Sequence, residues 1–230
     1  MNQETNKRMI MSYLDLMSTY HNQTKRNYLQ RVIEHDKAKC AEVAIKYGKD
    51  YWDGDRKYGF GGNYYDGRWK PFAQKMVDHY GLKPGTKILE VGCGKGFLLY
   101  EFTQVLPNVE VAGIDISEYA LENAKPEIKN NLTLTSADNL PYADKTFDFV
   151  FSVMTLHNLY NYQLHKALQE IERVGKNNKY IVVESYRNEQ EKANLLYWQL
   201  TCRIFSTPQE WEWFYKLSGY TGDYSFAFFE

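Results

Sequence analysis

"ILEVGCGKGF", residues 88–97, is the stretch that decides how the rest of this 230-residue sequence is interpreted. A short run of β-favouring residues passes directly into glycines at alternate positions, Gly92, Gly94 and Gly96. Glycine reaches backbone conformations that other residues avoid, and it lets a ligand come close to the main chain. The pattern therefore predicts a buried strand that ends in a ligand-binding turn.

Two common nucleotide-binding motifs fit this turn poorly. A phosphate-binding P-loop has a Ser or Thr after its lysine, whereas Lys95 is followed by Gly96. The dinucleotide fingerprint is G-x-G-x-x-G, and this turn is one residue tighter. A dehydrogenase therefore stays only as an alternative, which would bind NADH.

The segments that follow residue 70 alternate between strand and helix. Strand-like runs at 87–91, 109–114, 132–135, 147–153 and 179–185 are separated by helical patterns. Such alternation predicts a doubly wound, Rossmann-like α/β fold with a mostly parallel sheet. The tail indicates a helix capped near Thr207, with Pro208 in its first turn, and then a last strand. We expect that C-terminal strand to run antiparallel, for want of a connecting helix of crossover length.

The first 69 residues have a different character. Apolar residues at Ile10, Tyr13, Leu14 and Met17, and again from Tyr28 to Ile33, recur at helical spacing and predict two helices. Residues 51–69 then hold seven aromatic residues, six charged residues and five glycines. This combination favours an ordered loop that folds over a binding site as a lid. We therefore divide the chain into an N-terminal lid segment, 1–69, and a Rossmann-like domain, 70–230.

Composition limits the partners of the protein. A formal net charge of -1 provides no general attraction to nucleic acid or to anionic lipid, and no apolar stretch reaches the length of a membrane span. Three widely spaced cysteines and scattered histidines indicate neither a disulfide framework nor a metal site. We expect a cytoplasmic protein that acts on a small molecule, as a monomer or a homodimer.

The turn and its surroundings resemble the class I S-adenosylmethionine-dependent methyltransferases. E-V-G-C-G-K-G is similar to the glycine-rich motif of that family, VAGIDIS to the strand that ends in its ribose-binding acid, and SADNLPYADKTFDFV to its adenine-binding segment. FSVMTLHNL is similar to the fourth-strand motif that lines the methyl-transfer site. The resemblance implies S-adenosylmethionine as cofactor and S-adenosylhomocysteine as product. It implies cofactor contacts from Glu90, Gly92, Cys93, Gly94, Gly96, Asp115, Ile116, Asp138, Asn139 and Ser152.

A closer resemblance, spread over nearly the whole chain, is to small methyltransferases of bacterial capsule or lipopolysaccharide gene clusters. The chain is also similar to the methyltransferase domain of ovothiol biosynthesis, which methylates an imidazole nitrogen. These similarities imply methyl transfer to an O or N atom of a small polar metabolite, such as a sugar or a phosphorylated precursor of a surface polysaccharide. A non-catalytic cofactor-binding partner of another methyltransferase is the remaining alternative.

Acceptor and catalytic residues follow from position rather than from a motif. His157 comes just after the fourth strand and, with an unshifted pKa near 6.5, is a candidate general base, or else a histidine that orients the turn. Tyr58 and Arg68, in the aromatic loop, are the other catalytic candidates. For the acceptor we expect one wall from Tyr186 and Trp198 and a facing wall from the aromatic loop, with substrate contacts from Tyr51, Arg56 and Tyr65.

Overall fold

The computed structural model describes residues 11–21 and 26–230, and it contains one sheet of six strands. The strand order is β3-β2-β1-β4-β5-β6, and every neighbouring pair is parallel. The strands are β1 (Lys87–Val91), β2 (Glu110–Asp115), β3 (Leu132–Leu134), β4 (Phe147–Val153), β5 (Gly175–Glu184) and β6 (Asp223–Ala227). Strand order reverses between β1 and β4, and in such sheets the ligand site lies beyond the carboxyl ends of the strands at that point.

Ten α-helices occupy the described part of the chain. They are α1 (Ser18–His21), α2 (Tyr28–Glu34), α3 (Lys37–Ala44), α4 (Lys49–Asp53), α5 (Lys70–Tyr80), α6 (Phe97–Val105), α7 (Glu118–Glu122), α8 (Asn161–Val174), α9 (Glu189–Trp198) and α10 (Pro208–Ser218). Two short 3-10 turns, Lys129–Asn131 and Leu156–Asn158, complete the regular structure. Within the described residues, no helix combines the length and apolar character needed to cross a membrane.

Helices cover both faces of the sheet. On one face α8 and α10 bury apolar side chains against residues such as Leu89 and Val150. On the other face α5 and α6 pack against residues such as Ile88 and Phe149. Alternate residues of each strand thus enter opposite cores, as expected for a doubly wound sheet.

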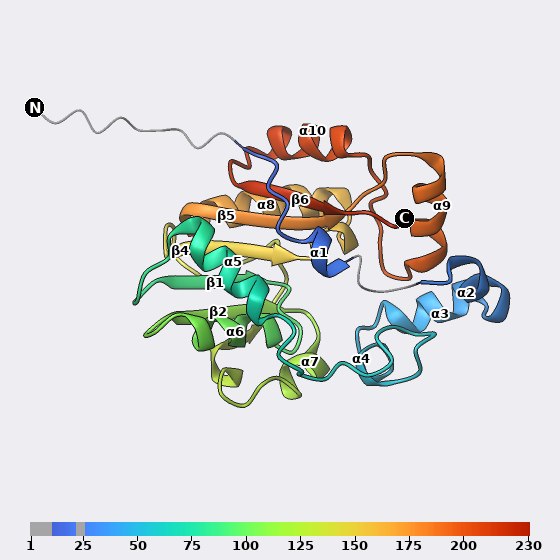
Figure 1. Ribbon diagram of the computed structural model, residues 1–230, viewed down its shortest axis with the longest axis horizontal. Helices are drawn as coiled ribbons and strands as arrows, with labels where there is room; N and C mark the ends of the chain where they lie inside the picture. Colours follow the sequence, from blue (N-terminus) through green and yellow to red (C-terminus); the bar gives the residue numbers. More distant parts are fainter. Residues whose placement is uncertain (1–10, 22–25) are drawn as a thin grey trace, which may run out of the picture.

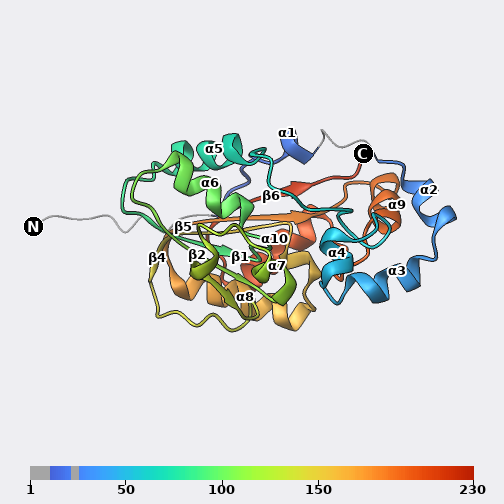
Figure 2. The same cartoon turned by 90° about the horizontal axis from the view of Figure 1, so that it is seen from below.

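Three helices of the N-terminal segment lie at the carboxyl end of the sheet. In Figures 1 and 2, α2, α3 and α4 gather with α9 beyond the end toward which the strand arrowheads point. The predicted helix at Tyr28 is confirmed as α2. The earlier one is wrong over the described residues: Tyr13 forms an isolated parallel bridge with Tyr224 of β6, and helix α1 starts only at Ser18. Ile10, which we assigned to the same helix, lies outside the described residues.

The last strand also corrects a prediction. The tail helix is confirmed as α10, with Thr207 and Glu210 in a reciprocal capping box and Gly219 closing the helix at φ 74°. β6, however, pairs parallel to β5, from Tyr180↔Asp223 to Glu184↔Ala227. The antiparallel expectation is wrong because α10 itself is the crossover helix that returns the chain to the same end of the sheet.

Candidate cofactor and acceptor site

The glycine turn after β1 is held by the neighbouring strands. Gly92, Gly94 and Gly96 have φ values of 82°, 52° and 71°, in the region that favours glycine. The amides of Gly92 and Cys93 both donate to the Ile114 carbonyl, at 2.8 and 2.9 Å. A Cβ atom at Gly92 would lie 2.2 Å from the Thr155 methyl group. The turn is thus closely packed against the loop that follows β4, and glycine is required there.

Asp115, at the end of β2, is fixed by backbone amides. Gly94 donates to one carboxylate oxygen and Ser117 to the other, both at 2.8 Å. Burial raises the pKa of Asp115, and these amides act in the opposite direction by stabilising the charged form. Each carboxylate oxygen can accept a further hydrogen bond, which leaves capacity for a pair of hydroxyl groups.

Glu90 and Cys93 are both buried beside this carboxylate. Glu90 is 4% exposed, and its Oε2 has no hydrogen-bond partner among the described residues. Burial, reinforced by the charge of Asp115, raises the pKa of Glu90 well above its usual range. Burial likewise raises the pKa of the Cys93 thiol, so Cys93 is a small packed side chain rather than an activated nucleophile. An unpartnered buried carboxyl oxygen marks a place where a cationic or donor group of a ligand fits.

The residues expected at the adenine end lie in different environments. Ile116 is 53% exposed, Asp138 is half-buried, and Asn139 is exposed. Thr135 links Asn139 to the end of β2. The Thr135 hydroxyl donates to the Asn139 carbonyl at 3.1 Å, and the Thr135 amide donates to the Asp115 carbonyl at 3.0 Å. Ser152 is fully buried and donates to the Val91 carbonyl, so its hydroxyl joins two strands inside the sheet.

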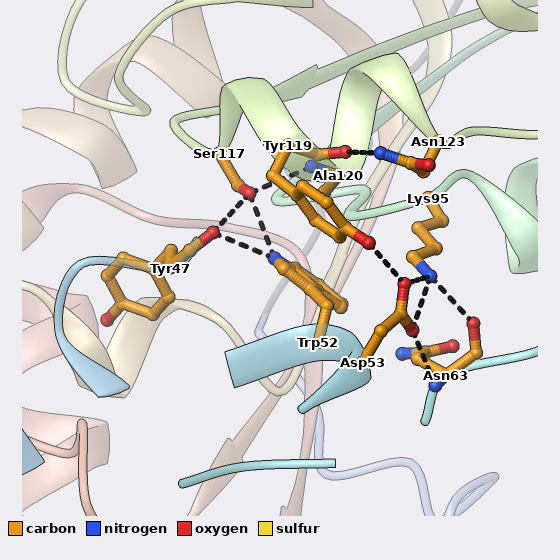
Figure 3. A network of polar contacts seen from close by, with 9 residues as sticks. All are labelled: Tyr47, Trp52, Asp53, Asn63, Lys95, Ser117, Tyr119, Ala120 and Asn123. Carbon is orange, nitrogen blue, oxygen red and sulfur yellow. Dashed lines mark hydrogen bonds and ion pairs between the residues drawn. The ribbon is translucent and has the colours of Figure 1, made fainter. Parts of the chain in front are cut away.

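The aromatic segment packs directly on the glycine turn. A Cβ atom at Gly94 would lie 2.6 Å from the Trp52 ring, which stacks on Phe60 with 5.1 Å between centroids. Figure 3 shows the Trp52 ring nitrogen donating to the Ser117 hydroxyl and the Tyr47 carbonyl, at 2.9 and 3.0 Å. The aromatic rings of this segment therefore pack on the glycine turn, and its glycines allow the backbone to bend tightly around these rings.

A buried ion pair fastens the same segment to the turn. Lys95 donates to both carboxylate oxygens of Asp53 at 2.7 Å and to the Asn63 carbonyl at 2.9 Å (Figure 3). The Tyr119 hydroxyl and the Asn63 amide also donate to Asp53, at 2.8 and 3.1 Å. We call these four residues the Asp53–Lys95 junction. It connects α4, the aromatic segment, the glycine turn and α7.

His157 occupies a different environment from the one we expected. It is 2% exposed, its Nδ1 accepts from the Glu184 amide at 3.3 Å, and its Nε2 lies 3.4 Å from the Glu184 carboxylate. Burial lowers its pKa to about 3, so the expected value near 6.5 is wrong because that value assumed a hydrated ring. Burial conversely raises the pKa of Glu184 to about 8, despite a hydrogen bond from Gln199.

The other catalytic candidates lie toward the surface. Arg68 is 71% exposed and pairs with Asp66, its Nε donating to a carboxylate oxygen at 2.7 Å. Tyr58 is half-buried, and the Lys57 ammonium lies 4.9 Å from its ring centroid. Neither residue has a described contact with Asp115 or the glycine turn.

The acceptor candidates lie in three different places. Trp198 and Tyr186 share an apolar cluster, and the Arg56 guanidinium lies 5.2 Å from the Trp198 ring centroid. Tyr51 packs on Trp52 with 5.3 Å between centroids, which places it next to the turn. Tyr65 does not join them: it packs against Phe97 and Tyr100 of α6.

Sequence reasoning missed Lys95, Glu184 and Ser117. Lys95 was considered only as part of a P-loop, although a lysine inside a buried glycine turn always needs a counter-charge. Glu184 ends the fifth strand at the ligand-binding edge, and this position could have predicted Glu184 as a site residue. Over residues 11–21 and 26–230, no group of three His, Cys, Asp or Glu side chains could hold a metal ion.

Comparison with known proteins agrees with this geometry. Residues 82–219 match the family model described as a methyltransferase domain. A demethylmenaquinone methyltransferase of Symbiobacterium thermophilum is 35% identical over 118 residues, which cover 48% of this chain and 46% of that protein. A protein of the same name from Staphylococcus aureus is 35% identical over 112 residues, 46% of each chain. The chain thus spans about half the length of the curated relatives it matches.

Solved structures share the fold. The YcgJ protein of Bacillus subtilis has a TM-score of 0.52 at 19% identity, covering 64% of this chain and 66% of its own. The [4+2]-cyclase SpnF has a TM-score of 0.54 at 15% identity, covering 92% of this chain and 74% of its own. Because one of these proteins is named a cyclase, the fold alone does not fix the reaction. The family match together with the fold does fix the family: the chain belongs to the class I methyltransferase-domain family, whose methyl donor is S-adenosylmethionine.

Proposed function

We propose that this protein transfers a methyl group from S-adenosylmethionine to an O or N atom of a small polar metabolite. The observation that carries the proposal is the unpartnered buried carboxyl oxygen of Glu90 next to the amide-fixed carboxylate of Asp115. The residues present fit the cofactor. Asp115 would accept the ribose hydroxyls, Glu90 would face the ammonium group, and the backbone of Gly92 and Gly94 would adjoin the amino-acid part.

When bound, S-adenosylmethionine supplies a methyl group on a positively charged sulfur. The aromatic segment would then exclude water from the transfer site, with Trp52 over Gly94 and Tyr51 beside it. Catalysis of this kind depends mostly on positioning in a dry pocket. We propose that residues 1–69 act as this cover and that residues 70–230 form the cofactor-binding unit.

Proton transfer is a separate matter from positioning. With a pKa of about 3 and both ring nitrogens facing Glu184, His157 fits the orienting role better than the role of a base. We propose that Glu184, which ends β5 at the ligand-binding edge of the sheet, takes the proton from acceptors that must lose one; because its pKa is about 8, only its ionised fraction acts as a base at neutral pH. Tyr58 and Arg68 stay proposals: Tyr58→Phe and Arg68→Ala should lower turnover without weakening cofactor binding.

The nature of the acceptor is the finer part of the proposal. The curated relatives are named for demethylmenaquinone, but the charged aromatic segment of this chain favours a small polar acceptor instead. The resemblance to capsule and lipopolysaccharide methyltransferases supports a sugar or phosphorylated precursor, and that to the ovothiol methyltransferase supports an imidazole. We propose a cytoplasmic location, which suits the three free cysteines.

The experiment is to incubate the purified protein with S-adenosylmethionine and one acceptor at a time, and to measure S-adenosylhomocysteine by mass spectrometry. The panel contains sugars, phosphorylated sugars, imidazole thiols and a demethylated quinone. Product that forms only with one polar class supports the proposal. Tight cofactor binding without product from any class would favour the non-catalytic alternative, and product only from the quinone would overturn the polar acceptor.

A further inference from the structure

Three arginines surround one tryptophan at the carboxyl end of the sheet. The guanidinium carbons of Arg26, Arg31 and Arg56 lie 5.5, 4.6 and 5.2 Å from the Trp198 ring centroid. We call these residues the arginine cluster. Arg31 belongs to α2, Trp198 ends α9, and Arg56 comes from the aromatic segment. Figures 1 and 2 both show α2 beside α9, so segments far apart in the sequence assemble this cluster.

Two cations of the cluster, Arg31 and Arg56, lie close together, whereas the charge of Arg26 is felt by the Glu184 carboxyl group. Burial and the neighbouring Arg56 lower the pKa of Arg31, and burial and Arg26 lower the pKa of Arg56. Among the described residues, neither Arg31 nor Arg56 forms an ion pair. Two carboxylates close in sequence to Arg31 and Arg56 are engaged elsewhere: Asp55 pairs with Lys57, and Glu34 accepts from Gln30. Like charges held this close repel each other, which is costly unless an anion is bound between them.

Arg31 and Arg56 also retain unused hydrogen-bond donors. Nη1 of Arg31 donates to the Arg56 carbonyl at 3.4 Å, and Nη1 of Arg56 donates to the Gly59 carbonyl. Nε of Arg31 is buried and has no partner among the described residues. A guanidinium carries five N–H donors in a planar fork, so these two side chains have several donors left for an oxyanion.

A depression that is open to solvent adjoins the cluster. It is lined by Arg26, Tyr28, Leu29, Asn194 and Tyr197, together with Asn27 and Gln190. Its lining combines a cation, aromatic rings and amides, and a phosphate group can reach Arg26 from this side. The amide of Asn194 already donates to the Phe229 carbonyl at 2.9 Å, which fixes that wall.

The cluster lies next to the proposed transfer site. Arg56 is on the same segment as Trp52, which covers Gly94. Trp198 precedes Gln199, whose amide donates to Glu184. The charge of Arg26 also acts on the Glu184 carboxyl group, so the cluster adjoins the end of β5.

We propose that the arginine cluster binds a phosphate monoester group of the methyl acceptor. The inference rests on the proposed function and narrows its acceptor to phosphorylated metabolites. Phosphate fits better than carboxylate because it carries up to two negative charges at neutral pH and three oxygens that accept hydrogen bonds. Guanidinium groups stacked on an aromatic ring stay planar and aligned, which suits bidentate contacts to such a group.

The test uses inorganic phosphate as the probe. Phosphate is titrated into the protein by calorimetry at constant ionic strength. Acetate is titrated in the same way to compare a carboxylate with phosphate, and S-adenosylhomocysteine is titrated separately. The variants are Arg31→Gln, Arg56→Gln and the charge-preserving Arg31→Lys. Lys166→Gln is the matched control, because Lys166 is an exposed cation on α8.

We expect saturable phosphate binding in the wild type, at least tenfold weaker in Arg31→Gln and Arg56→Gln, partly retained in Arg31→Lys and unchanged in Lys166→Gln. S-adenosylhomocysteine binding should change less than twofold in every variant, which also shows that the variants fold. Absent phosphate binding, equal binding by acetate, or full affinity in both glutamine variants would overturn the inference. If S-adenosylhomocysteine also fails to bind the wild type, the proposed function fails as well, so the two failures are distinguishable.

Discussion

Replacing Asp53 by Asn should loosen the aromatic segment from the glycine turn. The Lys95 ammonium is 5% exposed and has Asp53 as its counter-charge, with the Asn63 carbonyl as its third contact. Asn keeps the shape of the side chain but removes the charge. Lys95 would then be a buried cation without a partner, and the Tyr119 hydroxyl would lose a charged acceptor.

The expected cost follows from burial. Removing one partner of a fully buried pair costs about 3–5 kcal/mol, and Asp53 is 16% exposed, so we expect roughly 2–3 kcal/mol. A difference of that size corresponds to about a 30- to 150-fold larger opening equilibrium of the segment. The loss is local, because the junction fastens the cover and not the sheet.

Hydrogen–deuterium exchange measures this opening directly. The amides of Phe60, Gly62 and Asn63, which donate to Tyr51, Trp52 and Asp53 respectively, should exchange about 30- to 150-fold faster in the variant. Amides of β1 and β4 should keep their rates. Asp50→Asn, an exposed carboxylate of the same helix, is the matched control and should leave the segment protected.

A double variant separates the charge effect from the shape effect. Because Asp53→Asn with Lys95→Met removes both charges, it should recover most of the protection lost in Asp53→Asn. If Asp53→Asn exchanged like the wild type, or if the two substitutions were simply additive, the junction would not hold the segment and our reasoning would be wrong.

Two further predictions concern buried groups of the site. Folding raises the pKa of Glu184 to about 8, so the folded state binds more protons than the unfolded state above the ordinary glutamate pKa, and this contribution makes stability fall as pH rises to 8. His157 contributes an opposite slope only up to its ordinary value of 6.5. Burial also raises the pKa of Glu90, so Glu90 contributes a fall of the same sign as Glu184. Between pH 6.5 and 8, the loss of unfolding free energy measured with denaturant should therefore be smaller in Glu184→Gln than in the wild type by on the order of 1–2 kcal/mol, and an equally steep fall in the variant would contradict the assignment. Gly94→Ala should displace Trp52, since φ is positive at Gly94 and the new methyl group would lie 2.6 Å from the ring. Tryptophan fluorescence should therefore shift in this variant. Gly81→Ala, at an exposed helix-end glycine with open space around it, is the control and should leave the fluorescence unchanged.

Local sequence patterns predicted the central strands of the sheet correctly, but not the direction of β6 or the pairing of Tyr13 beside it. The runs at 87–91 and 147–153 are confirmed with the same bounds, because each is a short run rich in β-favouring apolar residues between turn residues. The direction of β6 was wrong because α10 was not recognised as a crossover. The helix predicted around Tyr13 was wrong because pairing with Tyr224 outweighs helical spacing.

The site was predictable where it depends on sequence order and unpredictable where it depends on packing. Asp115 and the glycines follow from strand ends, so the residues expected there meet in space. The pKa values of His157 and Glu184 depend on burial by segments far away in the chain, and so does the arginine cluster. Aromatic composition predicted an ordered loop, and its role as a lid stays a prediction; the contact between Trp52 and Gly94 could not be predicted from composition.

The central claim is that Asp115 and the glycine turn bind an adenosyl sulfonium compound, and calorimetric titration with S-adenosylhomocysteine tests it most directly. We predict saturable binding to the wild type and at least tenfold weaker binding to Asp115→Asn, because hydrogen bonds to a charged group contribute about 1.5–3 kcal/mol each. Binding to Asp78→Asn, which changes an exposed carboxylate of α5, should be the same as in the wild type. Binding of NADH without binding of S-adenosylhomocysteine, or full affinity in Asp115→Asn, would contradict the account.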